Sequence, residues 1–173
     1  MEQIAEIGVW MRVYLPLTFG QLRSAVAAGT VSAPRIGFAV TPALREWYVS
    51  GDAEALEYAA MTDAAAESLR LLAADPDSPA RRVVVAADVA DGSVRLTPDR
   101  HPAALVVSAA VPIADVASVH VDDPAAAADI TLAAVAVAGA QAGDPDAAFV
   151  VAGAEDHELQ WYAVQELTDL LAD

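Results

Sequence analysis

RRVVVAADV, residues 81–89, is the stretch of this sequence that decides the fold. Between Arg82 and Asp88 every side chain is valine or alanine, and the proline-bearing segment DPDSP (75–79) separates the stretch from what precedes it. A short, continuous apolar run bounded by turn residues is typical of a buried strand. We therefore expect a sheet that contains this strand and is flanked by helices.

Two further strands precede this stretch. In MRVYLPLT (11–18), apolar side chains alternate with Arg12, Tyr14 and Pro16, as in a half-buried strand. The short apolar run IGFAV (36–40) is typical of a buried strand. The first half of the chain therefore contributes three strands to the predicted sheet.

Helix signals lie between these strands. Thr18 is a suitable N-cap for a helix that stops at Gly29, and Thr41 followed by a proline is a suitable start for another. Asp52 caps a long helix that the prolines of DPDSP end. Strands separated by helices favour parallel crossovers. We predict an α/β fold, a single domain with a mixed, largely parallel sheet flanked by helices.

The second half of the chain continues the alternation. Residues 91–98 resemble a turn and a short strand, which predicts a hairpin at the sheet edge. An acidic cap and a proline at Asp122-Asp123-Pro124 begin another helix. Further strands are expected at 104–111, 116–122 and 148–153, and a terminal helix is expected over 154–171.

The length of the chain, 173 residues, suits one domain. Met11 opens the first strand and could itself be a start. We assign residues 1–10 to an N-terminal extension, either poorly ordered or the product of an upstream start. Residues 11–173 form the expected single α/β domain.

Composition excludes several classes of partner. The chain has 25 acidic and 9 basic residues, a net charge of −16, and no basic stripe for a phosphate backbone. It has no cysteine and no uncharged apolar run of about 20 residues. We expect a cytoplasmic protein that binds neither nucleic acid nor a membrane. Its acidity indicates solubility, a basic partner or cation binding, and its oligomeric state stays open.

No motif in the sequence states a reaction. No glycine-rich phosphate loop follows a strand, and the nucleophile motif G-x-S-x-G is absent. His157 and Glu158 match the first half of H-E-x-x-H, but Trp161 stands where the second histidine belongs. We therefore name no catalytic residue, expect no cofactor and no assigned metal, and favour a protein without enzymatic activity.

Polar side chains at the carboxyl ends of the predicted strands form a first candidate site, because ligands bind there in open parallel sheets. His120 alternates with Ser118 and Asp122, which allows a proton relay, a metal site or a solvent-facing row. Thr41 and Arg45 could hold a small anion at a helix start, or Arg45 could form a surface pair. The candidate ligand or metal rim comprises Thr41, Arg45, Asp88, His120, Asp122 and His157.

Two Trp-Tyr pairs, both in predicted helices, form a second candidate. Their helical spacing is typical of side chains that fill an alanine-rich core. If they are exposed beside acidic residues, they are instead candidate hot spots for a protein partner. The candidate partner surface comprises Trp47, Tyr48, Trp161 and Tyr162.

Several segments also follow the order of a known family. MRVYLPLT, FAVTPALREWY, RRVVVAADV, PIADVASVHVDD and the closing AEDHELQWYAVQEL resemble a family of small acidic proteins encoded in actinobacterial genomes. The resemblance covers nearly the whole chain from Met11 onward. It implies a domain of unknown function and carries over no catalytic residue.

Two hypotheses about function follow from the sequence. The first is a non-catalytic cytosolic domain that binds a protein partner or regulates one, motivated by the missing motifs, the acidity and the Trp-Tyr pairs. The alternative is a small-molecule or metal-dependent activity at the carboxyl ends of the sheet strands.

Overall fold

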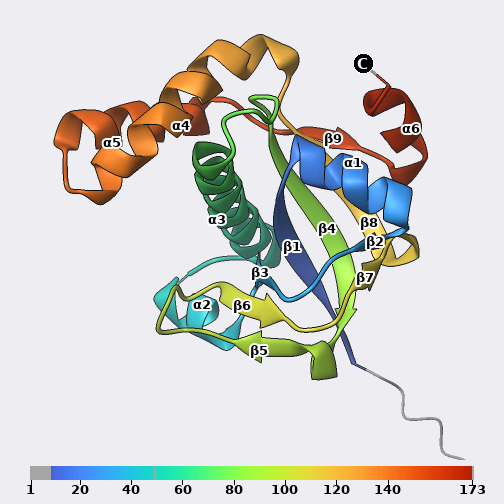
Figure 1. Cartoon of the computed structure of the whole chain (residues 1–173). Helices are drawn as coiled ribbons and strands as arrows, with labels where there is room; N and C mark the ends of the chain where they lie inside the picture. The colour runs from blue at the N-terminus through green and yellow to red at the C-terminus, as the bar shows by residue number, and fades with distance from the viewer. Residues whose placement is uncertain (1–8, 49, 173) are drawn as a thin grey trace, which may run out of the picture.

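The structure, a computed structural model, describes residues 9–48 and 50–172. Within these residues, a seven-stranded sheet has the order β5-β6-β3-β1-β4-β8-β9, and a small second sheet pairs β2 with β7 (Figure 1). The strands are β1 (Trp10–Thr18), β2 (Thr30–Val31), β3 (Arg35–Phe38), β4 (Arg82–Ala90), β5 (Val94–Leu96), β6 (Ala104–Val107), β7 (Val111–Pro112), β8 (Val116–Val121) and β9 (Gln160–Tyr162). The α-helices are α1 (Phe19–Ala28), α2 (Pro42–Trp47), α3 (Ala53–Ala74), α4 (Ala127–Gln141), α5 (Pro145–Ala152) and α6 (Leu167–Leu170). Short 3-10 turns are η1 (Asp91–Ser93), η2 (Ile113–Asp115), η3 (Pro124–Ala126), η4 (Gly153–Asp156) and η5 (Val164–Glu166).

The prediction of a largely parallel sheet is wrong. Every strand pairing in the described residues is antiparallel, including β1 with β3 and β1 with β4. The reason is the length of α1, whose 10 residues cover about 15 Å. The 9 residues of β1 cover about 30 Å. Helix α1 is therefore too short to return the chain to the start of β1. Strand β3 begins near the end of β1 and runs in the opposite direction.

A parallel crossover does occur, but around another strand. Strands β3 and β4 are both antiparallel to β1, so they run in the same direction. The 22 residues of α3 cover about 33 Å, which is enough to return the chain along the sheet between them. Because β1 lies between β3 and β4, the two parallel strands are not neighbours.

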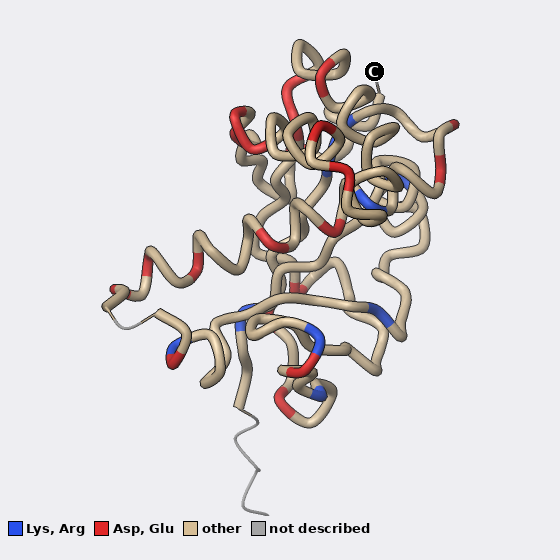
Figure 2. The backbone as a smooth tube through the Cα atoms, turned by 90° about the vertical axis from the view of Figure 1, so that its left-hand side faces the viewer, with Lys and Arg blue, Asp and Glu red and all other residues tan. Residues whose placement is uncertain are grey.

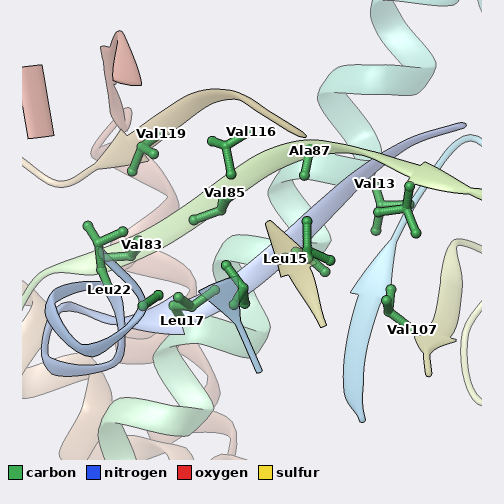
Figure 3. Packing of buried hydrophobic residues seen from close by; sticks show 14 of the residues in the cluster. Val13, Leu15, Leu17, Leu22, Val83, Val85, Ala87, Val107, Val116 and Val119 are labelled. Carbon is green, nitrogen blue, oxygen red and sulfur yellow. The ribbon is translucent and has the colours of Figure 1, made fainter. Parts of the chain in front are cut away.

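Successive side chains of the two central strands enter opposite sides of the sheet. On one side, Val13, Leu15 and Leu17 of β1 pack beside Val83 and Val85 of β4 (Figure 3). Helices α1 and α6 contribute buried side chains to the same cluster. This side of the sheet therefore forms the larger part of the core, and β4 is the buried strand that the sequence predicts.

Helix α3 covers the other side of the sheet. Tyr14, Val84 and Ala86 point towards it, and the helix presents Ala60 and Ala64 to them. Small side chains at this contact let the helix backbone approach the strands closely. Alanines therefore lie at the contact between this long helix and the sheet.

The close approach of α3 places a serine in contact with the two central strands. Ser68 is fully buried, and its hydroxyl accepts a hydrogen bond from Val83 N–H at 3.0 Å and donates one to Leu17 O at 2.7 Å. Leu17 and Val83 lie directly opposite each other in the β1–β4 register. The Ser68 hydroxyl therefore bridges the two central strands at this step of the ladder.

The predicted helix starts are confirmed. Thr18 caps α1, which ends at Gly29 in the left-handed region with a φ of 79°. Thr41 caps α2, with a proline in the first turn, and Asp52 caps α3. The predicted edge hairpin is also confirmed, because β5 is the outermost strand and pairs with β6.

Two predictions for the end of the chain are wrong. The expected strand at 148–153 lies largely in α5, because Asp144 accepts from two backbone N–H groups and Pro145 occupies the first turn. The expected terminal helix is interrupted by β9, where Trp161 lies opposite His120 of β8. An open strand edge offers backbone partners that local helical spacing does not reveal.

The predicted boundary at residue 11 falls inside a strand. Strand β1 begins at Trp10, which lies opposite Ala90, and Asp91 N–H donates to Val9 O. Residues 1–8 of the expected extension lie outside the described residues.

One described helical stretch, Pro124–Gln141, is long and apolar enough to cross a membrane by length and composition, and 22% of it is buried. Its buried side chains, among them Ile130 and Val137, belong to one cluster with Leu69 and Leu72 of α3. Core helices of soluble proteins meet the same criterion. The expected absence of a membrane span stays a prediction.

Candidate functional site

The predicted rim residues lie at two opposite ends of the sheet. In an antiparallel sheet, the carboxyl ends of neighbouring strands alternate between two edges. Thr41 follows β3 and Asp88 lies near the end of β4, and these strands run in the same direction. Asp122 follows β8, which runs the opposite way. The six residues therefore form no single rim.

Three of the rim residues have separate surface or structural roles. Thr41 is buried, accepts from Leu44 N–H and donates to Pro102 O. Arg45 is exposed in the last turn of α2. Asp88 pairs with Arg12 across β1 and β4 at 2.9 Å, with both side chains about half exposed.

His120 lies on β8 between β4 and β9. Its Nε2 is 3.1 Å from Ser118 Oγ, so the predicted alternation does bring these two side chains together. Burial lowers the pKa of His120. Asp122 bonds to an arginine instead, so the three side chains form no relay.

The partly buried His120 predicts a loss of stability on acidification. Its folded-state pKa is lowered below the ordinary 6.5, so the unfolded chain binds the proton more readily. The contribution of neutral His120 to the free energy of unfolding is therefore complete above the ordinary pKa of 6.5. It is lost as the pH falls from there towards the lower pKa of the folded state. Urea unfolding from about pH 7.5 to about pH 5.5 should show a smaller decline for His120→Gln than for the wild type. Identical declines in both proteins would contradict this assignment.

Arg82 and Asp122 form a buried ion pair between β4 and the end of β8. Their side chains are 4% and 0% exposed. Nε and Nη2 of Arg82 donate to the two carboxylate oxygens at 2.9 and 2.8 Å, and the Arg82 backbone N–H donates to Asp122 Oδ2 at 2.8 Å. This bidentate geometry fixes the guanidinium plane.

The same guanidinium anchors the segment that follows α5. Arg82 Nη2 also donates to His157 O at 2.8 Å, and His157 Nε2 lies 2.8 Å from Asp129 Oδ2 in the first turn of α4. The structure therefore brings two predicted rim residues, Asp122 and His157, to one place. They meet through Arg82 and not by direct contact of their side chains.

A cleft of about 280 Å³ lies beside this ion pair, and we call it the α3 cleft. One wall is the face of α3 that carries Met61, Ala65 and Leu69. Val151 of α5 also lines it, as does Leu159 in the segment that Arg82 anchors. Arg82 itself is part of the lining, so a buried cation borders a largely apolar cleft.

One nitrogen of this cation has no partner among the residues that the structure describes. Arg82 Nη1 makes no hydrogen bond within residues 9–48 and 50–172. The fully buried, unpaired side-chain atoms of these residues are Ser78 Oγ and Thr97 Oγ1, so Nη1 retains contact with solvent. Arg82 lines the α3 cleft, so Nη1 is the nitrogen of this lining residue that remains available as a donor.

The mouth of the α3 cleft is acidic. Glu155 and Glu158 line it and are both exposed. Burial raises the pKa of Asp63 on α3, and the charge of Glu155 adds to the rise against the opposing effects of His101 and Arg70. The charge of Arg82 is balanced by Asp122, so the cleft combines apolar walls, one free donor and carboxylates at its mouth.

The part of the chain that the structure describes contains no group of three or more His, Asp or Glu side chains that could hold a metal ion. His120 is bonded to Ser118 and His157 to Asp129. The described residues therefore provide no set of ligands for the metal-dependent form of the alternative hypothesis.

The tryptophans of the Trp-Tyr pairs do not fill the core. Trp47 and Trp161 are 72% and 61% exposed, so the core-packing interpretation is wrong for both. Tyr48 is also exposed, whereas Tyr162 packs partly against the core. In Figure 1, α2 and β9 lie at opposite ends of the molecule, so the two pairs form no common surface.

A larger apolar surface lies on α4 and α5, which project beyond α3 in Figure 1. Helix α5 has no buried residue. Phe149 and Val135 are 82% and 79% exposed, and Leu132 and Val150 are exposed as well. We call these four side chains the α4–α5 face. Helices α4 and α5 meet at Gly139 and Ala147, and exposed apolar surface on neighbouring helices is a candidate interaction site.

A family model described as a family of unknown function, DUF6912, matches residues 11–171. The chain belongs to this family. No curated protein and no solved structure matches it. Membership confirms that the chain is a domain of unknown function, and it assigns no site residue in DUF6912.

In this DUF6912 chain, reasoning from the sequence missed Arg82, Asp129 and the α4–α5 face. Arg82 looks like a charge that flanks a strand, and its partner Asp122 lies 40 positions along the chain. A usable signal was present, because a charge at the start of a buried strand requires a counter-charge and Asp122 directly follows another buried strand. Because residues 148–153 were predicted to form a strand, Phe149 was not recognised as an exposed residue of a helix.

Proposed function

We propose that this protein is a non-catalytic domain that binds an apolar, positively charged segment of another protein through the α4–α5 face. One observation carries the proposal: α5 is strongly apolar, yet none of its residues is fully buried against the rest of the described chain. Leaving a large apolar side chain in water instead of burying it costs about 1.5–3 kcal/mol. A partner that covers Phe149 and Val135 would recover that free energy.

The charge of the occupant follows from the charge of the surroundings. Residues 101–173 contain no lysine or arginine, and Asp129, Asp144 and Asp146 lie in or beside the two helices. Figure 2 shows how acidic positions outnumber basic ones along the chain. A basic segment is attracted to such a surface, whereas a second copy of the same face and an anionic membrane are repelled.

A designed peptide tests the proposal. The probe is an amphipathic helix of about 18 residues with leucine on one face and arginine on the other, a form that docks in apolar grooves. Fluorescence anisotropy should show binding that weakens as salt is raised. The double variant Phe149→Ser, Val135→Ser should bind at least about 30-fold more weakly, because two buried anchors that contribute about 1 kcal/mol each amount to about 2 kcal/mol.

Trp47→Ser is the matched control, because Trp47 is a similarly exposed apolar side chain on a different helix. It should leave the affinity within about twofold, and neither variant should change the free energy of unfolding by more than about 0.5 kcal/mol. Unchanged affinity in the double variant contradicts the proposal. So does binding to anionic lipid vesicles, or a dimer that the double variant abolishes.

A further inference from the structure

We propose that the α3 cleft is a second, independent binding site for a small amphiphilic cation that carries an uncharged oxygen acceptor. It does not depend on the α4–α5 face being a docking surface. Each part of the expected ligand corresponds to one part of the cleft. An apolar body lies against the walls, an oxygen accepts from Arg82 Nη1, and an ammonium group lies at the acidic mouth.

The hydrogen bonds that Arg82 already makes indicate which acceptor group the ligand should carry. The guanidinium is held by Asp122 through two nitrogens and by His157 O through one of them, so its position and charge are both set. Among the guanidinium nitrogens, only Nη1 has no bond within the described residues, and Arg82 lines a largely apolar cleft in which water has few other partners. Because Asp122 already neutralises the cation, a neutral carbonyl, amide or hydroxyl oxygen fits it without adding an unbalanced buried charge.

The acidic residues at the mouth of the cleft indicate that the ligand should carry a positive charge. Glu155 and Glu158 line the cleft and are both exposed, whereas the one arginine of the lining, Arg82, is already paired with Asp122. A ligand carboxylate would have to pass these two charges. An ammonium group would be attracted to them, and apolar side chains such as Met61, Leu69 and Val151 would cover the ligand between its two polar ends.

Three matched probes test this ligand class in titrations of the full-length protein followed by NMR. They are leucyl-phenylalanine amide, its N-acetyl form, which lacks the cation, and leucyl-phenylalanine as the free acid. The amide should bind most tightly, and each of the other two should bind about fivefold more weakly or worse. The acetyl form loses the ammonium contact with the mouth, and the free acid adds a carboxylate that has no balancing charge in the cleft. The Arg82 Nε–H signal, which reports the buried guanidinium, should move with the amide.

Variants distinguish binding in the α3 cleft from unspecific attraction of a cation to the acidic surface. Glu155→Gln with Glu158→Gln should remove the preference for the amide over its acetylated form, whereas Glu46→Gln with Glu54→Gln, exposed on α2 and at the start of α3, should keep it. Ala66→Trp, which fills the cleft from α3, should weaken the amide at least tenfold. Tighter binding of the free acid than of the amide would overturn the proposal, as would unchanged affinity in Ala66→Trp or an Arg82 signal that does not move.

Discussion

Asp122→Asn is expected to lower the free energy of unfolding by about 3–5 kcal/mol, the range found when one member of a buried ion pair is removed. Asparagine keeps the shape of the side chain and an acceptor oxygen, so the backbone bond from Arg82 can survive. What is lost is the charge that balances a guanidinium only 4% exposed. Urea unfolding followed by circular dichroism gives the measurement.

The exposed pair of Arg12 and Asp88 supplies the control. It also joins β4 to a neighbouring strand, and its partners are 2.9 Å apart, but its side chains are 44% and 48% exposed. Asp88→Asn should therefore cost about 1 kcal/mol or less. If the two asparagine variants lose similar amounts, the Arg82–Asp122 pair is not the buried anchor described above.

Ser68→Ala is the second large effect, with an expected loss of about 2–4 kcal/mol. Removal of the hydroxyl leaves Val83 N–H and Leu17 O without their shared partner, and an unsatisfied buried polar group costs about 1–3 kcal/mol. The alanine itself fits, since it is smaller than serine. Amide hydrogen exchange at Val83 should accelerate together with the fall in unfolding free energy.

Ser24→Ala is the matched substitution outside the sheet. Ser24 donates to Gly20 O on the exposed side of α1, so its removal leaves no buried group unpaired and should change stability by less than about 0.5 kcal/mol. A neutral Ser68→Ala would mean that the two backbone groups are satisfied without the hydroxyl, and that this bridge is dispensable.

Local signals predicted the parts of the fold that depend on neighbouring residues. The caps at Thr18, Thr41 and Asp52 and the buried strand at β4 follow from a few adjacent side chains, and the structure confirms them. Strand direction depends on how far each helix carries the chain relative to the strand before it. The 10 residues of α1 are too few to return along β1, and that comparison of lengths was available in the sequence but not used.

The candidate site was predicted in part, for a similar reason. Asp122 and His157 were chosen for the edge of a parallel sheet, and they do meet, although the sheet is antiparallel. They meet because both bond to Arg82, which is 40 positions from one and 75 from the other. Side-chain partners at such separations leave no periodic pattern, so only the electrostatic requirement of a buried charge could have indicated them.

The lack of buried residues in α5 also bears on how this protein would respond to proteases. Segments with few buried contacts open locally at a lower free energy than the central strands. The turn between α4 and α5, residues 142–144, is exposed and is a natural point of attack once the helices separate. Trypsin cuts only after lysine or arginine, and the last such residue is Arg100. Limited digestion with trypsin would therefore report a resistant C-terminal half however often α4 and α5 open, whereas an elastase-type enzyme that cuts after small apolar residues would detect the opening.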